Sequence, residues 1–547
     1  MTTRGRGATI ALACAGVFVA YLPVVTVTVG LPAIQRALGA STAQLSWVSD
    51  AFVLPVAALI LTAGVFSDVH GRKKVYQVGL ALCAVGALVA LCARSVQVLW
   101  LGQGLAGAGA AALLPVTLAL ISHAVPDHRE RGKYIGLWTT CMMAAMAGPP
   151  LIAGVILEHV GWRWIFVLPV PLALLTMVIA ARLLQESRAS AGRRLDWPGQ
   201  ITAALAITAL IYGVIEGGAE SFTHPRTLVA LAVAVVSAAA FVVIELRSDA
   251  PMLDLSLFRS PAFTAASLAA LISFLGLIGF FFVLSLYFGV VQQLTTLQSG
   301  VRMVLVNVVS MLLGLVMGRL MRRVSPRVLI TVGLLVAAVA LLSLTTLGPD
   351  TSFGSVAWRL ALLGLGLGLA FPCITSIAVT AVPPRQAGMA AAGSNAFRQV
   401  GGALGPALMG ALLTVQAVGA LPGHLAEAGL TGERARQITD TAAASGLGAV
   451  AGLDLGVDAE RALSAMSEAF LDGLRLCLFV SAVLLVLAAL AAAVLLRQRQ
   501  PAATAPAAAA PAAPGGVRRP EPAASPVGAA SSHPGRQDPA YNQPDRL

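Results

Sequence analysis

One short stretch, GVFSDVHGRKKV at residues 64–75, places an aspartate just before three consecutive basic residues, where a long apolar run ends. Asp68 is flanked by Gly64 and Gly71, and Arg72 follows it by one helical turn. A carboxylate near a helix C-terminus faces the negative end of the helix dipole, so a cation or another helix N-terminus must compensate it. The spacing therefore predicts a carboxylate–guanidinium pair that forms in one state and is released in another.

A second candidate for chemistry is Asp50, in the apolar sequence WVSDAFVL. An ionisable side chain inside a membrane span is costly and usually has a function. Asp50 lies one turn inside an expected span over residues 46–67. It either handles protons or substrate, or it is a solvated residue at the outer mouth.

The composition shows what kind of protein must position these residues. The chain has 547 residues, of which 58% are hydrophobic and 11% charged, with a mean hydropathy of +0.85. Soluble proteins carry roughly twice that charged fraction, about 25%. The net charge of +12 does not indicate nucleic-acid binding, because the basic residues lie between apolar runs. We therefore expect an all-α integral membrane protein.

Fourteen apolar runs approach the length of about 20 residues that a spanning helix needs. They cover residues 8–31, 46–67, 75–94, 98–122, 134–158, 163–184, 199–217, 227–246, 262–290, 303–320, 327–347, 355–381, 399–418 and 473–496.

The connecting segments alternate between many and few basic residues. With the N-terminus inside, the inside segments are rich in arginine, and they include Arg72, Arg385 and Arg398. Because cytoplasmic loops are enriched in Lys and Arg, we expect both termini in the cytoplasm of a bacterium and the protein in its inner membrane. Segment 419–472 is then a long extracytoplasmic loop.

An internal repeat links the two halves of the chain at a nearly constant offset. The matched positions are Gly64 with Gly318 and Gly79 with Gly333, 254 residues apart, and Pro150 with Pro406, 256 residues apart. Parallel repeats of this kind are typical of transporters that bind substrate between two halves.

The repeat predicts a division of the chain into four parts. A six-helix bundle covers 1–184, two inserted helices cover 185–250, and a second six-helix bundle covers 251–498. A Pro/Ala-rich tail at 499–547 cannot form a core and is expected to be disordered in the cytoplasm.

The opening stretch resembles the signature between helices 2 and 3 of the major facilitator superfamily (MFS). The matching residues are Gly64, Asp68, Gly71, Arg72 and Lys73. The resemblance implies the MFS fold, with two six-helix bundles as parallel repeats plus two inserted helices. It also implies that this cluster fastens the two halves on the cytoplasmic side. The alternative is that the basic residues only anchor a helix end at the membrane surface.

Fourteen spans and local matches such as LDWPG and NAFRQVGGALGPALMG resemble the drug:proton antiporter branch of that superfamily. Two places depart from the branch. Helix 1 holds Pro23, Val25 and Thr28 where the branch usually has Asp, Thr and Asn, and helix 4 holds Gln103 where it usually has Arg. The branch is thought to use those residues for protons, so Asp50 and Gln103 remain the candidate proton or substrate site.

The helix 5 motif of the branch is present in altered form, with Gly148, Pro149 and Pro150. Two prolines remove two backbone donors and predict a bend. The bend serves antiport or is only a kink.

Four aromatic residues are candidate walls of a substrate cavity: Trp47, Phe52, Phe281 and Tyr287. The alternative for each is packing or contact with lipid. The expected spans hold few charges, which favours a lipophilic substrate.

We predict a monomeric alternating-access exporter of small lipophilic drugs or antibiotics, working by proton antiport and giving resistance. It is not an enzyme and needs no metal or cofactor, and the sequence has no ATP-binding GxxxxGK[ST] motif. One alternative is an exporter of a self-made metabolite with weakened or absent proton coupling. An alternative of another class is a transport-inactive receptor or assembly subunit.

Overall fold

The computed structural model describes residues 3–39, 42–188, 196–219, 221–248, 251, 253–383, 386–445 and 458–496. Within these residues all regular structure is helical, and fourteen helices are long and apolar enough to cross a membrane. Helices satisfy their own backbone hydrogen bonds, as a chain in lipid must. The first seven spans are α1 (Thr3–Leu38), α2 (Thr42–His70), α3 (Arg72–Leu91), α4 (Val96–Ala124), α5 (His128–His159), α6 (Pro169–Leu183) together with the 3-10 helix Trp162–Val167 that precedes it, and α7 (Trp197–Ala219). The other seven are α8 (Pro225–Arg247), α9 (Pro261–Leu286), α10 (Thr296–Arg323), α11 (Pro326–Leu344), α12 (Phe353–Thr380), α13 (Ala387–Glu427) and α16 (Ala459–Leu495).

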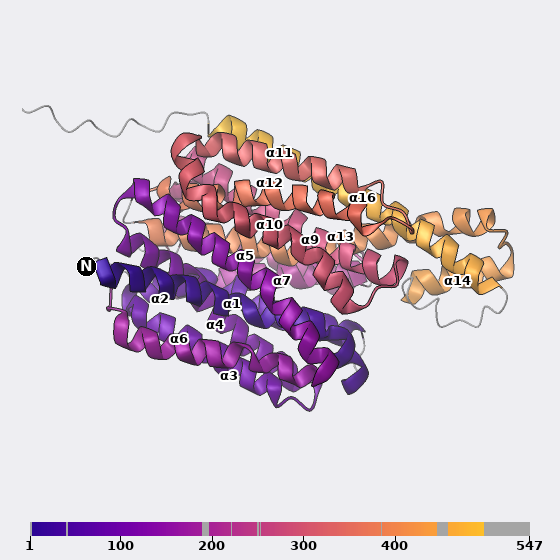
Figure 1. Cartoon of the computed structure of the whole chain (residues 1–547), viewed down its shortest axis with the longest axis horizontal. Helices are drawn as coiled ribbons and strands as arrows, with labels where there is room; N and C mark the ends of the chain where they lie inside the picture. Colours follow the sequence, from indigo (N-terminus) through magenta and orange to yellow (C-terminus); the bar gives the residue numbers. More distant parts are fainter. Residues whose placement is uncertain are drawn as a thin grey trace, which may run out of the picture. The chain divides into compact units, whose positions relative to one another are not determined.

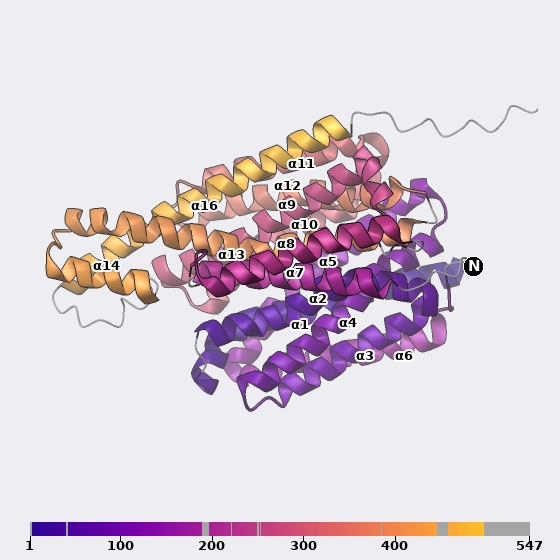
Figure 2. The same cartoon turned by 180° about the vertical axis from the view of Figure 1, so that it is seen from behind.

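The helices form two groups with the same internal packing. In the first group α2 and α3 pack on α4, α1 packs on α5, and α3 packs on α6. In the second group α10 and α11 pack on α12, α9 packs on α13, and α11 packs on α16. The two groups lie side by side in both views, indigo to magenta for the first and red to yellow for the second (Figures 1 and 2). The repeat expected from the paired glycines is therefore present in the packing.

The two groups meet along two equivalent seams. One seam is the contact of α2 with α13, and the other is the contact of α10 with α5. The repeat relates the two contacts, because α2 corresponds to α10 and α5 to α13. The inserted helix α7 packs on α8, and also on both α2 and α13. Helix α7 of the inserted pair therefore covers the α2–α13 seam.

Segment 419–472, expected to be one long loop, is largely helical. Helix α13 continues to Glu427, helix α14 covers Glu433–Ser445, and α16 already begins at Ala459. At 1.5 Å per residue, the 41 residues of α13 span about 60 Å, twice the thickness of a hydrocarbon core. Apolar residues of these extensions form a separate small core, which includes Leu421, Ile438 and Met466. The loop prediction failed because this segment is polar on one face only.

Helix α13 also begins twelve residues earlier than its predicted span of 399–418. Arg398, expected in a cytoplasmic segment, therefore lies inside a membrane helix and is 5% exposed. The expected tail at 499–547 lies outside the described residues.

Candidate functional site

The α2–α3 junction is a tight turn built around a charge pair. Helix α2 ends at His70, Gly71 adopts a left-handed φ of +109°, and α3 begins at Arg72. The Arg72 guanidinium donates to Asp68 Oδ1 at 3.0 Å, and their side chains are only 14% and 8% exposed. The guanidinium compensates the carboxylate at the negative end of α2.

The same carboxylate reaches the other half of the molecule. Asp68 Oδ2 lies 3.1 Å from the position that a Cβ atom would take on Gly388. Gly388 is the second residue of α13, in the turn where free backbone N–H groups and the helix dipole favour an anion. Asp68 therefore lies between a cation of its own half and a helix N-terminus of the other half.

Glu186, which the sequence analysis did not select, completes this junction. Its Oε1 accepts a hydrogen bond from the backbone N–H of Lys73 at 3.0 Å, and so caps the start of α3. A Cβ atom on Gly71 would lie 2.5 Å from the Glu186 carboxylate. The segment after α6 also accepts from the Arg72 backbone N–H through Ser187 O at 3.0 Å. The second glycine of the motif thus leaves room for an acid from a distant segment.

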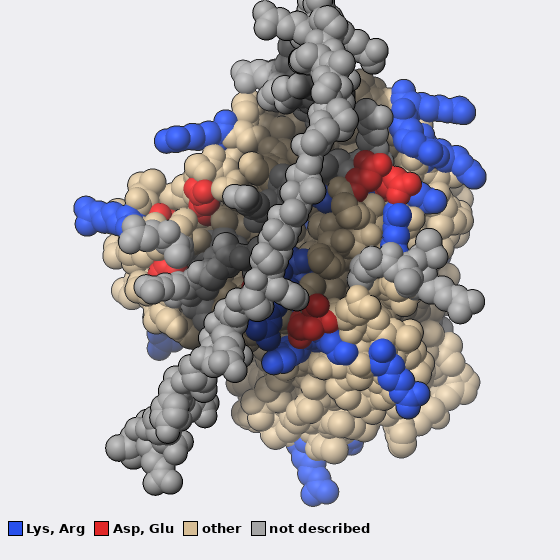
Figure 3. Space-filling model, turned by 90° about the vertical axis from the view of Figure 1, so that its left-hand side faces the viewer, with Lys and Arg blue, Asp and Glu red and all other residues tan. Residues whose placement is uncertain are grey.

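The first glycine of the motif lies in a seam, and so does its repeat partner. A Cβ atom on Gly64 would lie 2.8 Å from Ala392 Cβ of α13. On the other seam, a Cβ atom on Gly318 would lie 3.0 Å from Lys133 Cγ of α5. Both glycines let the backbones of the two halves come close at the same end of the bundle. We call it the basic end, because many Lys and Arg side chains surround it (Figure 3).

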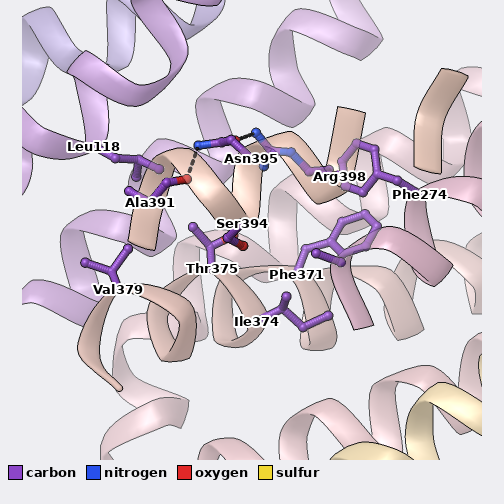
Figure 4. Close-up of a pocket in the computed structure, with 11 residues that line it drawn as sticks. Leu118, Phe274, Phe371, Ile374, Thr375, Val379, Ala391, Ser394, Asn395 and Arg398 are labelled. Atoms are coloured by element: carbon purple, nitrogen blue, oxygen red, sulfur yellow. Dashed lines mark hydrogen bonds between the residues drawn. The ribbon is translucent and has the colours of Figure 1, made fainter. Parts of the chain in front are cut away.

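A small cavity lies deeper between the helices, and a buried arginine lines it. Its walls come from α9, α12 and α13, with Leu118 of α4 contributed by the first half. Arg398 donates through Nη2 to Asn395 Oδ1, and Asn395 Nδ2 donates in turn to Ala391 O at 3.0 Å (Figure 4). The Arg398 Cζ atom lies 5.1 Å from the ring centre of Phe274, a distance typical of a cation–π contact.

The first half supplies a further contact to this arginine. Trp138 of α5 is fully buried, and its ring centre lies 5.6 Å from Arg398 Cζ. The indole Nε1 donates to Thr117 Oγ1 of α4 at 3.0 Å, which fixes the ring. Arg398 is therefore held between aromatic rings of both halves.

Asp50 and Gln103 lie at the same level of two packed helices. A Cβ atom on Gly104 of α4 would lie 3.7 Å from Ala51 O of α2. Gln103 precedes Gly104 and Asp50 precedes Ala51, so Gln103 and Asp50 lie at about equal depth. Gln103 is 1% exposed, and no described residue donates to its Oε1. Asp50 is half-buried and precedes Asp68 by about 27 Å along α2, which places it near the end opposite the basic end.

Comparison with known proteins decides the family. The profile of the Major Facilitator Superfamily matches residues 13–406. The chain belongs to the Major Facilitator Superfamily. The multidrug resistance protein Stp of Mycobacterium tuberculosis is 32% identical over 413 residues, 76% of this chain and 77% of Stp.

Two further comparisons extend over most of the chain. The tetracenomycin C resistance and export protein of Streptomyces glaucescens is 30% identical over 502 residues, 91% of this chain and 93% of that protein. The solved structure of the proton:xylose symporter XylE superposes with a TM-score of 0.58 at 11% identity, over 90% of this chain and 95% of that one. The structural match shows the MFS fold alone. The chain is a member of a transporter family and not an enzyme.

The aromatic residues proposed as cavity walls lie elsewhere in this MFS protein. Trp47 packs with Trp100 and Tyr212, at ring-centre distances of 6.4 and 6.1 Å. Phe52 is buried in the main core. The Trp47 contacts pack α2 against α4 and α7. Neither Trp47 nor Phe52 lines the cavity around Arg398.

The other two aromatic candidates are on or just after α9. Phe281 is half-buried beside Phe280, and Tyr287 is fully buried at the start of a short π-helix over Tyr287–Val291. The Tyr287 hydroxyl donates to Gly348 O at 2.8 Å, so it has a structural partner. Neither residue lines the cavity, whose aromatic walls are Phe274 and Phe371.

The helix 5 motif lies within a continuous helix. Pro149 and Pro150 are both inside α5 (His128–His159), with Pro149 buried and Pro150 half-buried. A Cβ atom on Gly148 would meet nothing within 4 Å. This glycine is therefore not needed for a close helix contact in the conformation described.

Proposed function

We propose that this MFS protein is an alternating-access exporter of lipophilic drugs or antibiotics that gives resistance. Its named relatives are resistance and export proteins, and the proposal extends that role to this chain. We further propose that it acts as a monomer in the cytoplasmic membrane of a bacterium. Both termini then lie in the cytoplasm, because the basic end carries the arginine-rich connections.

The observation that carries the proposal is the position of Asp68 between the two halves. Its carboxylate pairs with Arg72 of α3 and meets the first turn of α13. This contact closes the basic end, and it stabilises only the conformation in which the halves touch there. A carboxylate with two partners in one conformation and fewer in another biases a two-state equilibrium, as alternating access requires.

Proton antiport is the proposed energy source, with Asp50 as the proton site. Asp50 is a half-buried carboxylate inside a membrane helix, and Gln103 lies level with it on α4. Protonation of Asp50 removes a charge that is costly at this position. Proton binding at one end and release of the Asp68 contact at the other are then the two events to be coupled.

A second candidate is an exporter of a self-made metabolite with weakened or absent proton coupling. Two observations favour it: Pro23 lies where the branch usually has Asp, and the buried side chain at 103 is an amide that cannot bind and release protons. The apolar surface that faces the lipid and the Asp68 contact would be the same in the antiporter and in the uncoupled exporter.

Transport by purified protein in proteoliposomes separates these functions. Ethidium, Nile red and fluorescein are tested with an imposed pH gradient and after its collapse by an uncoupler. Transport that stops on collapse supports antiport, and transport that ignores it supports the uncoupled exporter. Dye that binds without crossing the membrane would instead indicate a transport-inactive receptor and refute both.

A further inference from the structure

We propose that the cavity around Arg398 is an anion site, and that the substrate is an aromatic molecule with one ionised oxygen acid, a carboxylate or a phenolate. The anion-site proposal names the substrate class of the proposed exporter, and it rests on the proposed export function.

The first argument is the state of the arginine. Arg398 is 5% exposed, and none of the described residues within ion-pair distance of it is an acid. Its one hydrogen bond to a described residue goes to the neutral amide of Asn395, and no described residue accepts from its Nε. A buried cation without a counter-ion is costly, so a ligand that supplies the negative charge binds favourably.

The second argument is the depth of the site. Arg398 follows the first residue of α13 by about 16 Å along the helix, roughly half of the 30 Å hydrocarbon core. Substrate sites of transporters with repeated halves lie near the midplane, between the halves. The position is that of a substrate group rather than of a surface anchor.

The third argument is the chemistry of the other walls. Phe274 and Phe371 pack with ring centres 5.0 Å apart and offer an aromatic face beside the guanidinium. Thr375 and Ser394 add hydroxyl groups, and none of the described residues that line the cavity is Asp or Glu. Hydroxyl donors, a fixed guanidinium and aromatic faces suit a flat anion and disfavour a cation.

The cavity is small in the conformation described. Its volume of about 10 Å³ is enough for a single water molecule only. Leu118 and Trp138 belong to the first half, and Arg398 belongs to the second. Separation of the halves therefore withdraws the Trp138 ring from the guanidinium and exposes it to an incoming anion. In the conformation described, cation–π contacts with the Trp138 and Phe274 rings stabilise the guanidinium in place of a bound anion.

The test is binding by the full-length protein in nanodiscs. The probes are anthracene-2-carboxylate and its carboxamide, which share one ring system and differ in charge. We expect the wild type to bind the acid at least ten-fold more tightly than the amide, as measured by fluorescence anisotropy. Equal affinities would overturn the proposal.

Variants locate the site. Arg398→Gln should weaken the acid at least ten-fold and change the amide less than two-fold. Arg302→Gln is the matched control, because Arg302 also lies over aromatic rings, Phe288 and Phe353, but outside the cavity. An acid preference that persists in Arg398→Gln contradicts the proposal.

A second measurement does not depend on the folding of that variant. Ser394 lines the cavity, and the acid should protect a Ser394→Cys protein from maleimide at concentrations where the amide does not. Equal protection by both probes, or none, would refute the anion site. Binding needs no transport, so an acid-binding protein that exports nothing would refute the exporter alone, whereas export of ethidium without acid preference would refute the anion site alone.

Discussion

The carboxylate of Asp68 and the backbone of Gly388 meet across the boundary between the two halves, with Oδ2 3.1 Å from the place where a Cβ atom would be. Arg72 holds the other oxygen of the same carboxylate at 3.0 Å. One charged group is thus shared by an ion pair within its half and a helix N-terminus of the opposite half, the contact that we propose closes the basic end.

Asp68→Asn should reduce transport of every substrate. A hydrogen bond to a charged group contributes about 1.5–3 kcal/mol, which corresponds to a roughly ten-fold or larger effect. Initial rates of dye efflux from cells measure it, with expression checked on blots. Asp440→Asn, at an exposed acid of α14, is the control. Wild-type rates for all dyes in Asp68→Asn would contradict a role in closing the basic end.

Gly64→Ala should shift the protein away from the closed basic end. The added methyl would lie 2.8 Å from Ala392 Cβ, and overpacking costs about 1–3 kcal/mol. We expect faster maleimide labelling of a cysteine at Ala391. Gly419→Ala is the control, because a Cβ atom on Gly419 of α13 would meet nothing within 4 Å. Equal labelling rates in the two glycine variants would show that the close approach is not limiting.

Gly71→Ala should destabilise the protein more than Gly429→Ala does. Both glycines have a positive φ, of +109° and +79°, where a residue with a Cβ is strained by about 1–3 kcal/mol. Only at Gly71 would the Cβ also meet a carboxylate, that of Glu186 at 2.5 Å, whereas Gly429 has open space. Thermal unfolding in detergent compares the two variants.

Glu186→Ala provides the second step of that comparison. In the Gly71→Ala background it removes the clash, so part of the lost stability should return. In the wild-type background it removes the cap from Lys73 N and should lower stability. Additive losses in the double variant would show that Gly71 and Glu186 do not interact.

Asp50→Asn should abolish the dependence of transport on the pH gradient. An amide at this position cannot bind and release a proton, and the change leaves the size of the side chain unchanged. Substrate-driven proton movement in proteoliposomes, followed with a pH-sensitive dye, measures the coupling. Persistent proton movement in the variant would move the proton site away from Asp50.

The number of spans and the repeat could be predicted because both follow from local patterns in the sequence. Apolar length determines where a helix crosses the bilayer, and the paired Gly64 and Gly318 mark equivalent contacts in the two seams. The charge spacing of Asp68 and Arg72 likewise predicted an ion pair, since both residues lie within one turn of each other.

Other features depend on contacts that no local pattern contains. In the sequence, nothing distinguishes Glu186 from other acidic residues that follow a span. Only the fold places it next to Lys73, 113 residues away. The sequence predicts a loop at Arg398 because Ser394, Asn395 and Arg398 make the start of α13 polar on the face toward the cavity. The aromatic lining of this cavity could not be predicted from the sequence for a related reason. Aromatic residues are common on every helix face, and only the packing selects Phe274 and Phe371.

The inserted helices make the two seams unequal. A molecule dissolved in the lipid that approaches the α2–α13 seam meets α7, which packs on both of its helices. At the opposite seam, α7 and α8 make no comparable contact with α5 or α10 among the described residues, and a Cβ atom on Gly136 would lie 3.9 Å from Gly314 O. A lipophilic substrate that enters directly from the bilayer would thus meet less obstruction at the α5–α10 seam than at the α2–α13 seam.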